Sequence, residues 1–284
     1  MRRRQRIAAW RAGLPERIAG AARRWGFAPG ETLAEGEASR ILSARGPDGS
    51  ALVLKCALPG QGLGAEAAAL AALAGRGVAR LVAADPAEGL LLLERAVPGT
   101  PLLVLARQDD EAALRIAARF VGALPAPVPP GGLFAEAAGW GRALATARGR
   151  LPQALLDRAS GLLAELSASA PERLLLHGDL HPANILRHGE GWIAVDPKGL
   201  IGERAAEAAC LLRHPADPAV LVRAPRRIAL LAEAARLDRQ RLAAWGYVAA
   251  AIAAAWAVQD GADPSPWLVA AEATAPLLSP RGSG

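Results

Sequence analysis

The chain is poor in lysine and asparagine. Lysine supplies only two of its 33 basic residues, Lys55 and Lys198, and Asn184 is its single asparagine. Together with the abundance of alanine, arginine and glycine, this composition indicates a genome of high GC content. Under such a bias, a lone lysine or asparagine points to a position where arginine or glutamine would not serve, since Lys and Arg differ in shape and hydration. These three residues are therefore candidates for a functional site.

Cysteine and long apolar runs are also scarce, which excludes several classes of protein. Cys56 and Cys210 lack the CxxC spacing of metal or redox sites, so we expect free thiols in a reducing cytoplasm. The longest uncharged run, 242–258, is dominated by alanine and falls short of the ~20 strongly apolar residues of a membrane span. It predicts a buried helix. The basic start at residues 1–4 is not followed by an apolar core, so we expect neither a signal peptide nor a membrane partner.

The net charge of +6 does not indicate a nucleic-acid partner, because the arginines are scattered along apparent helices without interleaved aromatic residues. Length and composition instead fit a globular chain of one large or two ordinary domains.

The pattern along the chain predicts an α+β fold with two lobes, 1–97 and 98–284. In the first lobe, apolar spacing and turn residues predict an opening helix over 6–25, strands at 32–33, 39–44, 50–55, 78–83 and 90–94, and a helix over 64–73. The second lobe is expected to be mainly helical, with helices over 109–124, 133–148 and 152–167 before residue 174 and further helices after residue 199.

The most informative segments are HGDLHPANIL at 177–186 and VDPKG at 195–199. They place Asp179, Asn184 and Asp196 in one short stretch, with apolar residues before, between and after them. Transfer of a phosphoryl group from Mg-ATP to a hydroxyl needs a base beside the acceptor oxygen and hard oxygen ligands for Mg²⁺. The spacing predicts strand, catalytic loop and strand, with both metal ligands at one end of a hairpin.

These segments, with LVLK, LLLERAVPG and AAWAVQDGADPSPW, resemble the aminoglycoside phosphotransferases over residues 30–275, and in particular the streptomycin kinase and hydroxyurea phosphotransferase branch. The resemblance implies a two-lobed protein-kinase-like fold with a small antiparallel sheet and one helix before a larger helical lobe. It also implies ATP and Mg²⁺ as cofactors and a small hydroxylated molecule as partner.

The resemblance implies a role for each matching residue. Asp179 would be the catalytic base and Asn184 and Asp196 the Mg²⁺ ligands, while adenine would bind the backbone C=O of Glu94 and N–H of Ala96. Lys55 would bind the α and β phosphates of ATP, and Glu66 would hold Lys55 in place. The short loop 35–39 stands in place of a GxGxxG loop, and its Ser39 would donate a hydrogen bond to ATP.

Some roles stay open. Lys198 could contact phosphate or substrate, or pair with Glu203. His177 and His181 are expected to support the loop rather than carry protons. Trp256 and Trp267 could line an acceptor pocket, although the core is their expected place. The carboxylates proposed for a cationic acceptor are Glu136, Glu165, Asp260 and Asp263.

The leading expectation is an ATP-dependent O-phosphotransferase acting on an aminoglycoside such as streptomycin. The alternatives are a metabolic kinase or hydroxyurea phosphotransferase with another acceptor, and a pseudokinase that binds nucleotide without turnover. The presence of Lys55, Asp179, Asn184 and Asp196 argues against the pseudokinase. The protein is expected to be a monomer or a weak dimer.

Overall fold

The chain forms two compact units. The computed structural model describes residues 3–60 and 62–278, so Met1 and Arg2 of the basic start lie outside the described residues. Unit 1 consists of 1–100 together with 187–198, and unit 2 of 101–186 together with 199–284. The expected division into lobes 1–97 and 98–284 remains a prediction. The structure groups 187–198 with the N-terminal unit.

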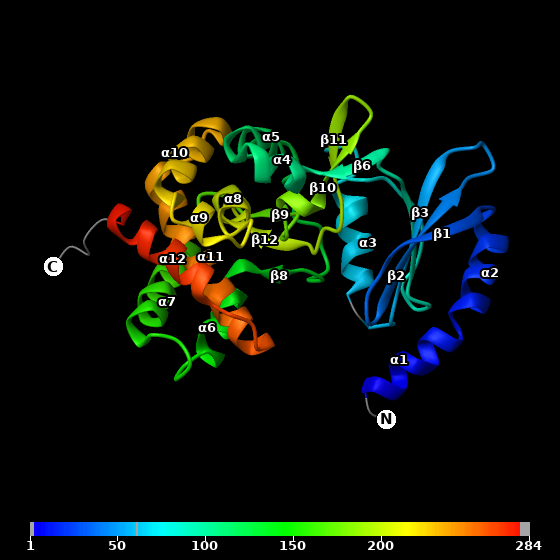
Figure 1. Cartoon of the computed structure of the whole chain (residues 1–284), viewed down its shortest axis with the longest axis horizontal. Helices are drawn as coiled ribbons and strands as arrows, with labels where there is room; N and C mark the ends of the chain where they lie inside the picture. Colours follow the sequence, from blue (N-terminus) through cyan, green and yellow to red (C-terminus); the bar gives the residue numbers. More distant parts are fainter. Residues whose placement is uncertain (1–2, 61, 279–284) are drawn as a thin grey trace. The chain divides into compact units, whose positions relative to one another are not determined.

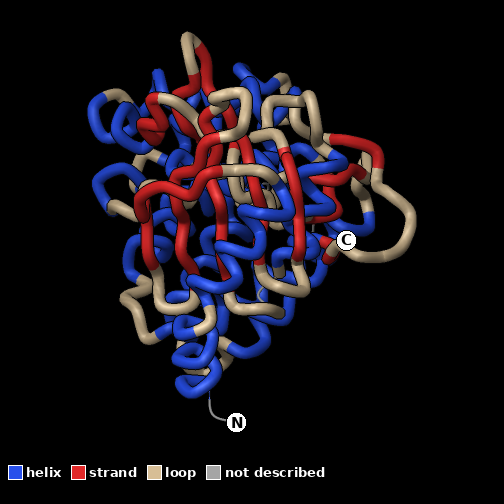
Figure 2. The backbone as a smooth tube through the Cα atoms, turned by 90° about the vertical axis from the view of Figure 1, so that its right-hand side faces the viewer, coloured by secondary structure: helices blue, strands red, loops and turns tan. Residues whose placement is uncertain are grey.

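Unit 1 is built around a five-stranded antiparallel sheet in the order β1-β2-β3-β5-β4, whose strands are red in Figure 2. A second sheet has the order β11-β10-β6. The elements are α1 (Arg3–Ala12), α2 (Leu14–Trp25), β1 (Ala28–Glu35), β2 (Ser39–Arg45), β3 (Ala51–Ala57), α3 (Leu63–Ala72), β4 (Leu81–Asp85), β5 (Leu90–Glu94), β6 (Pro98–Pro101), β10 (Ile185–His188) and β11 (Gly191–Ala194), of which β6 and β10 run across a boundary between the units. The expected small antiparallel sheet with one following helix is confirmed.

Side-chain alternation on β3 separates a structural face of the sheet from a polar one. Leu54 and Cys56 are fully buried and pack in one cluster with Trp10 of α1 and Leu14 of α2. Because successive side chains of a strand point to opposite faces, Lys55 points away from this cluster. It faces α3, which lies on the other side of the sheet from α2 in Figure 1.

Two expected helices are wrong in extent. The helix over 6–25 is two helices, α1 and α2, because Gly13 separates them and Pro15 lacks the N–H needed to continue the first. The helix over 133–148 is instead a short strand, a 3₁₀ helix and a short α-helix. Its first residues pair with β12 in a parallel sheet, and Gly139 and Gly141 weaken helix formation beyond them.

Unit 2 is mainly helical, as expected. Its small sheet has the order β7-β9-β12-β8. The elements are α4 (Leu102–Gln108), α5 (Asp110–Ala123), β7 (Ala126–Pro127), β8 (Ala135–Glu136), η1 (Ala137–Trp140), α6 (Gly141–Thr146), α7 (Gln153–Ala168), β9 (Leu174–Leu176), η2 (Pro182–Asn184), β12 (Leu200–Gly202), α8 (Arg204–Leu212), α9 (Pro218–Leu221), α10 (Ala224–Ala235), α11 (Arg239–Asp260), α12 (Ser265–Thr274) and η3 (Ala275–Leu277).

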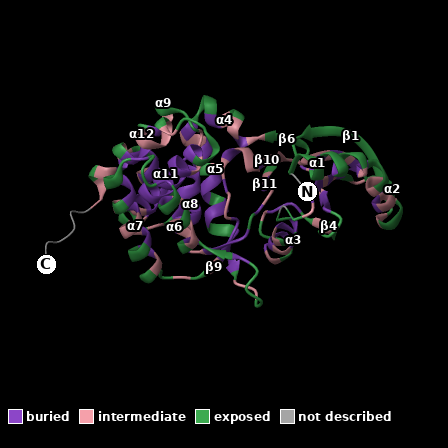
Figure 3. Ribbon diagram, turned by 90° about the horizontal axis from the view of Figure 1, so that it is seen from below, coloured by how far each residue is buried: buried purple, intermediate pink, exposed green. Residues whose placement is uncertain are grey.

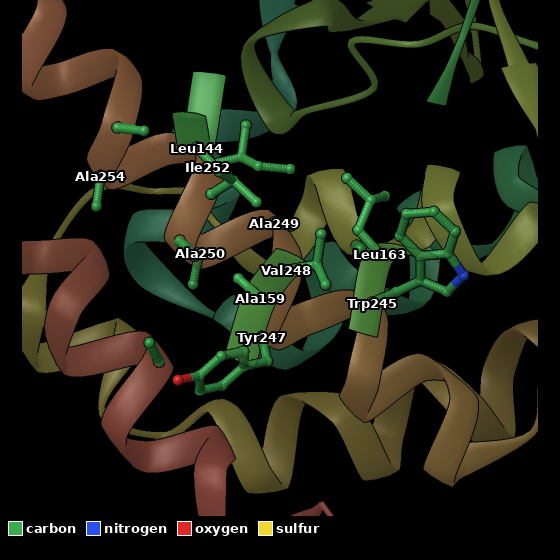
Figure 4. Packing of buried hydrophobic residues seen from close by; sticks show 14 of the residues in the cluster. Leu144, Ala159, Leu163, Trp245, Tyr247, Val248, Ala249, Ala250, Ile252 and Ala254 are labelled. Atoms are coloured by element: carbon green, nitrogen blue, oxygen red, sulfur yellow. The ribbon is translucent and has the colours of Figure 1, made fainter. Parts of the chain in front are cut away.

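Helix α11 is the centre of unit 2. Figure 3 shows it buried among helices whose outer surfaces are exposed, and Figure 4 shows its side chains beside Leu144 of α6 and Ala159 and Leu163 of α7. By length and composition this helix could cross a membrane, but 83% of its most apolar stretch is buried inside the protein. The expected buried helix over 242–258 is therefore confirmed.

Candidate functional site

The ammonium of Lys55 is held by two carboxylates of unit 1. Its Nζ is 2.8 Å from both Oε1 and Oε2 of Glu66 on α3, and 2.7 Å from Oδ1 of Asp196. The expected ion pair between Lys55 and Glu66 is present. Burial disfavours the charged ammonium, but the attraction of Asp196 and Glu66 outweighs burial and raises the pKa of Lys55. Lys55 is thus a fixed cation of the kind that binds phosphate oxygens.

Asp196 is an ionised carboxylate on a strained backbone. Its φ is 61°, in the left-handed region that side chains with a Cβ rarely adopt, and such strain clusters at functional sites. Its Oδ1 accepts hydrogen bonds from Lys55 and, at 2.8 Å, from Lys198. Burial opposes ionisation, but the two lysines outweigh it and lower the pKa of Asp196. Burial, with a further contribution from Asp196, raises the pKa of Glu66 instead. The pKa values of these two carboxylates are therefore shifted in opposite directions.

Lys198 contacts Asp196, and its expected alternative pairing with Glu203 is not observed among the described residues. Glu203 instead accepts hydrogen bonds from Nε1 of Trp245 and, at 2.6 Å, from Nε of Arg241. Glu203 is 2% exposed and precedes the first residue of α8. It therefore anchors α8 to α11 within unit 2.

The segment after β5 is tied to the β10–β11 hairpin. Glu94 ends β5 and Ala96 is buried in the stretch leading to β6. The next residue, Val97, donates its N–H to Nδ1 of His188 at 3.4 Å and accepts from the N–H of Gly189 at 2.8 Å. His188 Nε2 also lies 3.5 Å from Oε1 of Glu94. No pattern in the sequence marks His188, because only the fold brings it to this segment.

The short loop between β1 and β2 is a tight turn. The N–H of Gly36 donates to the C=O of Ser39 at 2.9 Å, and Arg40 pairs with Glu35 at 2.7 Å across the turn. A Cβ on Gly36 would meet the Ser39 hydroxyl at 2.7 Å, so glycine is required for this close approach. Ser39 is thereby held at the start of β2.

In unit 2, the backbone of the loop that carries Asp179 is fixed by Glu207 of α8. Both carboxylate oxygens of Glu207 accept the N–H of Gly178 at 3.2 Å. Gly178 has a φ of 80°, and a Cβ there would meet Cβ of Leu200 at 2.8 Å. Complete burial raises the pKa of Glu207 to about 7, against the lowering effect of the backbone N–H groups. The loop therefore depends on a carboxylate that titrates near neutral pH.

His177 and His181 brace the same loop, as expected. Nδ1 of His177 accepts the N–H of Asp179 at 3.3 Å, and Nδ1 of His181 accepts the N–H of Ala183 at the same distance. Nδ2 of Asn184 donates to the C=O of Asp179 at 3.0 Å. This bond turns the amide oxygen of Asn184 to the opposite side of the planar group. The side chain of Asp179 is 28% exposed, so water and small molecules can reach it.

Mg²⁺ takes one or two carboxylate or amide oxygens and completes its shell with water and phosphate, and each unit by itself carries an oxygen donor of this kind. Asn184 presents its amide oxygen, and Asp196 keeps Oδ2 while Oδ1 faces the two lysines. Within the described ranges no group of three or more His, Cys, Asp and Glu side chains forms a metal cluster.

The remaining residues singled out in the sequence lie elsewhere in unit 2. Trp256 and Trp267 are partly buried and pack against its core, as expected. Glu136 pairs with Arg173, and Asp263 accepts the N–H of Ser265, the first residue of α12, at 2.9 Å. The structure also places Arg213, which the sequence analysis did not consider, with Nη2 3.5 Å from Oδ1 of Asp179.

Comparisons with known proteins agree with this arrangement. A family model for aminoglycoside/hydroxyurea antibiotic resistance kinases matches residues 24–261. A hydroxyurea phosphotransferase of Kitasatospora aureofaciens is 35% identical over 257 residues, which cover 88% of this chain and 74% of that protein. A streptomycin 6-kinase of Streptomyces glaucescens is 33% identical over 266 residues, covering 89% and 86%.

Among solved structures, a thermostable mutant of aminoglycoside phosphotransferase APH(4)-Ia in complex with ADP and hygromycin B superposes with a TM-score of 0.60. The two chains are 18% identical, and the match covers 91% of this chain and 95% of that one. At this identity the likeness shows the fold alone, which confirms the expected protein-kinase-like α+β architecture. The family match spans most of the chain, and the chain belongs to the aminoglycoside/hydroxyurea antibiotic resistance kinase family.

Proposed function

We propose that this protein transfers the γ-phosphoryl group of ATP to a hydroxyl of a small molecule in the cytoplasm, and that the acceptor is an aminoglycoside such as streptomycin. The observation that carries the proposal is the ammonium of Lys55, held at hydrogen-bond distance by Glu66 and Asp196. A partly buried lysine paired with carboxylates is the arrangement that binds the phosphates of a nucleoside triphosphate in kinase-like folds.

Each residue of unit 1 has a proposed part in holding ATP. Lys55 would bind the α and β phosphates, and Glu66 would keep it in place. Ser39, at the turn between β1 and β2, would donate its hydroxyl to a phosphate oxygen, and Lys198 would contact phosphate or acceptor. Adenine would bind the backbone C=O of Glu94 and N–H of Ala96.

Asp179 of unit 2 would act as the base. The hydroxyl of the acceptor donates its proton to the Asp179 carboxylate while the acceptor oxygen bonds to the γ-phosphorus. The bond from that phosphorus to the β,γ-bridging oxygen breaks, which yields ADP and a phosphate ester. Asn184 and Asp196 would hold Mg²⁺, which neutralises the charge that develops on the phosphates.

The test is acceptor-stimulated ADP release with Mg-ATP, streptomycin, further aminoglycosides and hydroxyurea. We expect at least one acceptor to stimulate release, with the ester identified by mass spectrometry, and Asp179→Asn to lower kcat by at least about 100-fold. Asp157→Asn is the matched control, since Asp157 lies on an exposed part of α7 and pairs with the surface groups of Arg148 and Gln153. No stimulation by any acceptor, or full activity of Asp179→Asn, would disprove the proposal.

A second acceptor, hydroxyurea, is favoured by one observation: the hydroxyurea phosphotransferase is as similar to this chain as the streptomycin kinases. The ratio of kcat/KM for hydroxyurea to that for streptomycin decides between them. A ratio above one assigns the protein to hydroxyurea, and a ratio below one to the aminoglycoside.

A further inference from the structure

The turn that follows α8 is fixed by a buried arginine of α10. Arg227 is 2% exposed, and its guanidinium donates to the C=O groups of Leu212 at 3.0 Å, Leu211 at 3.3 Å and His214 at 2.6 Å. Its Nε also bonds Oδ2 of Asp110 on α5 at 3.0 Å. One side chain therefore binds the carbonyl groups of the last two residues of α8 and of His214 beyond it, which ties the backbone on both sides of Arg213 to α10.

This turn presents the side chain of Arg213. The guanidinium carbon lies 5.1 Å from the ring centroid of Trp256, in the range of a cation–π contact. The C=O of Arg213 accepts the N–H of the Trp267 ring at 3.1 Å. The guanidinium is thus held by the turn on one side and by an aromatic face on the other, with Nη2 3.5 Å from Oδ1 of Asp179.

Arg213 is expected to destabilise the folded state. It is 5% exposed, and its Nη1 is buried without a hydrogen-bond partner among the described residues. A buried N–H left unpaired destabilises the folded state. A protein is often at least as stable when an apolar side chain of similar length replaces a buried charge. Residues that leave a buried polar group unpaired without stabilising the fold are expected at functional sites. Stability alone does not explain an arginine at this position.

The two oxygens of Asp179 have different surroundings. Oδ1 faces the permanent cation of Arg213, whereas Oδ2 lies 3.9 Å from Nε2 of His181. The His181 ring packs on His214, with ring centroids 4.6 Å apart. Burial, together with Arg213 and His181, lowers the pKa of His214 to about 3, so this neighbour adds no charge at neutral pH.

We propose that Arg213 is a positioning residue for phosphoryl transfer. It holds the Asp179 carboxylate through Oδ1 and so leaves Oδ2 to receive the proton of the acceptor hydroxyl. The inference rests on the proposed function, because it assigns an orientation to the base of that reaction. A base displaced by about 1 Å can lose 100-fold in rate, so the effect should appear in kcat rather than in binding.

Three variants test this role. Arg213→Met removes the charge but keeps an unbranched stem against Trp256, and Arg213→Lys restores a charge. The matched control is Arg158→Met, because Arg158 also lies over an aromatic ring of unit 2, Tyr247, at 5.2 Å. Each is assayed with Mg-ATP and both streptomycin and hydroxyurea as probes, and its urea unfolding midpoint is measured.

We expect Arg213→Met to lower kcat about 100-fold, to leave KM for ATP and acceptor within about threefold, and not to lower the unfolding midpoint. Arg213→Lys should recover part of kcat, and Arg158→Met should stay within about threefold of the parent. In an Asp179→Asn background, Arg213→Met should have no further effect, because Arg213 acts through that carboxylate.

Full kcat in both Arg213 variants would overturn the inference. The inference would also be overturned if Arg213→Met lowered the urea unfolding midpoint together with kcat, and lowered kcat by the same factor in the Asp179→Asn background. These results differ from failure of the proposed function, in which the protein phosphorylates neither probe or Asp179→Asn retains activity.

Discussion

Nζ of Lys55 lies 2.7 Å from Oδ1 of Asp196, although 141 positions separate the two residues in the sequence. The same nitrogen is 2.8 Å from both oxygens of Glu66. A tetrahedral ammonium can donate to carboxylates that approach from different directions. A planar guanidinium points its donors within one plane and is longer, so it cannot replace lysine at this position.

Lys55→Arg should therefore impair the reaction with ATP even though the positive charge is retained. We expect kcat/KM for ATP to fall at least about 100-fold, because Arg must either leave Asp196 or displace Glu66. Arg45→Lys, an exchange in the opposite direction on the neighbouring strand β2, is the control and should leave the rate within about twofold. Steady-state kinetics with varied ATP measures both. A Lys55→Arg enzyme with normal kinetics would show that the shape of the cationic group at position 55 does not matter for the reaction.

Glu207 makes the stability of unit 2 depend on pH. Its pKa is about 7 in the folded protein and 4.5 in an exposed chain. Between these values the folded state holds a proton that the unfolded state releases, so the free energy of unfolding falls as pH rises from 4.5 to 7. The contribution is at most roughly 3 kcal/mol. Glu207→Gln removes this titration and can still accept the N–H of Gly178 through its amide oxygen.

We expect the Glu207→Gln variant to lose less stability than the parent between pH 4.5 and 7. Urea unfolding at half-unit steps measures the slopes, and Glu165→Gln on the exposed side of α7 corrects for removal of one carboxylate from the chain. Identical slopes for parent and Glu207→Gln would contradict the buried titration.

Two adjacent ion pairs join α10 to α5, and they differ in burial. Arg227 and Asp110 are 2% and 6% exposed at the side chain, whereas Arg226 and Glu111 are 72% and 31% exposed. Arg227→Met leaves Asp110 buried without its partner, and we expect a loss of about 3–5 kcal/mol in the free energy of unfolding. Arg226→Met should change stability little, because solvent screens the exposed pair.

Chemical denaturation of the two single variants gives the comparison. The double variant Arg227→Met/Asp110→Leu should regain part of the loss, since it removes the unpaired carboxylate as well. Equal effects of Arg226→Met and Arg227→Met would mean that burial does not determine the strength of these pairs.

The sequence predicted those parts of the protein that depend on local pattern and on rare residues. Strands β2, β3 and β5 lie close to the expected ranges 39–44, 50–55 and 90–94, and the turn between β2 and β3 follows from Gly-Pro-Asp-Gly at 46–49. The Lys55–Glu66 pair was predictable, because Glu66 is the only acid in its helix. Where the pattern failed, at 133–148, a pairing with β12 outweighed helical propensity.

Contacts that depend on tertiary packing could not be predicted. Arg213 is one of 31 arginines (33 basic residues less two lysines), and nothing in its neighbourhood distinguishes it. It contacts Asp179 only because Arg227 fixes the turn after α8. His188 likewise ends a strand whose partner is known only from the fold. The proposed roles of Asp179, Asn184 and Asp196 stay predictions until an acceptor is tested.

The grouping of 187–198 with unit 1 has a consequence for biosynthesis. The N–H of Ala79 donates to the C=O of Ala194, and the N–H of Ala194 to the C=O of Gly77, each at 2.8 Å. A ribosome delivers residue 194 only after residues 101–186 of the other unit have been made. Until then the nascent unit 1 lacks these bonds, and Lys55 has Glu66 without Asp196. Unit 1 therefore remains incomplete during synthesis of almost a third of the chain.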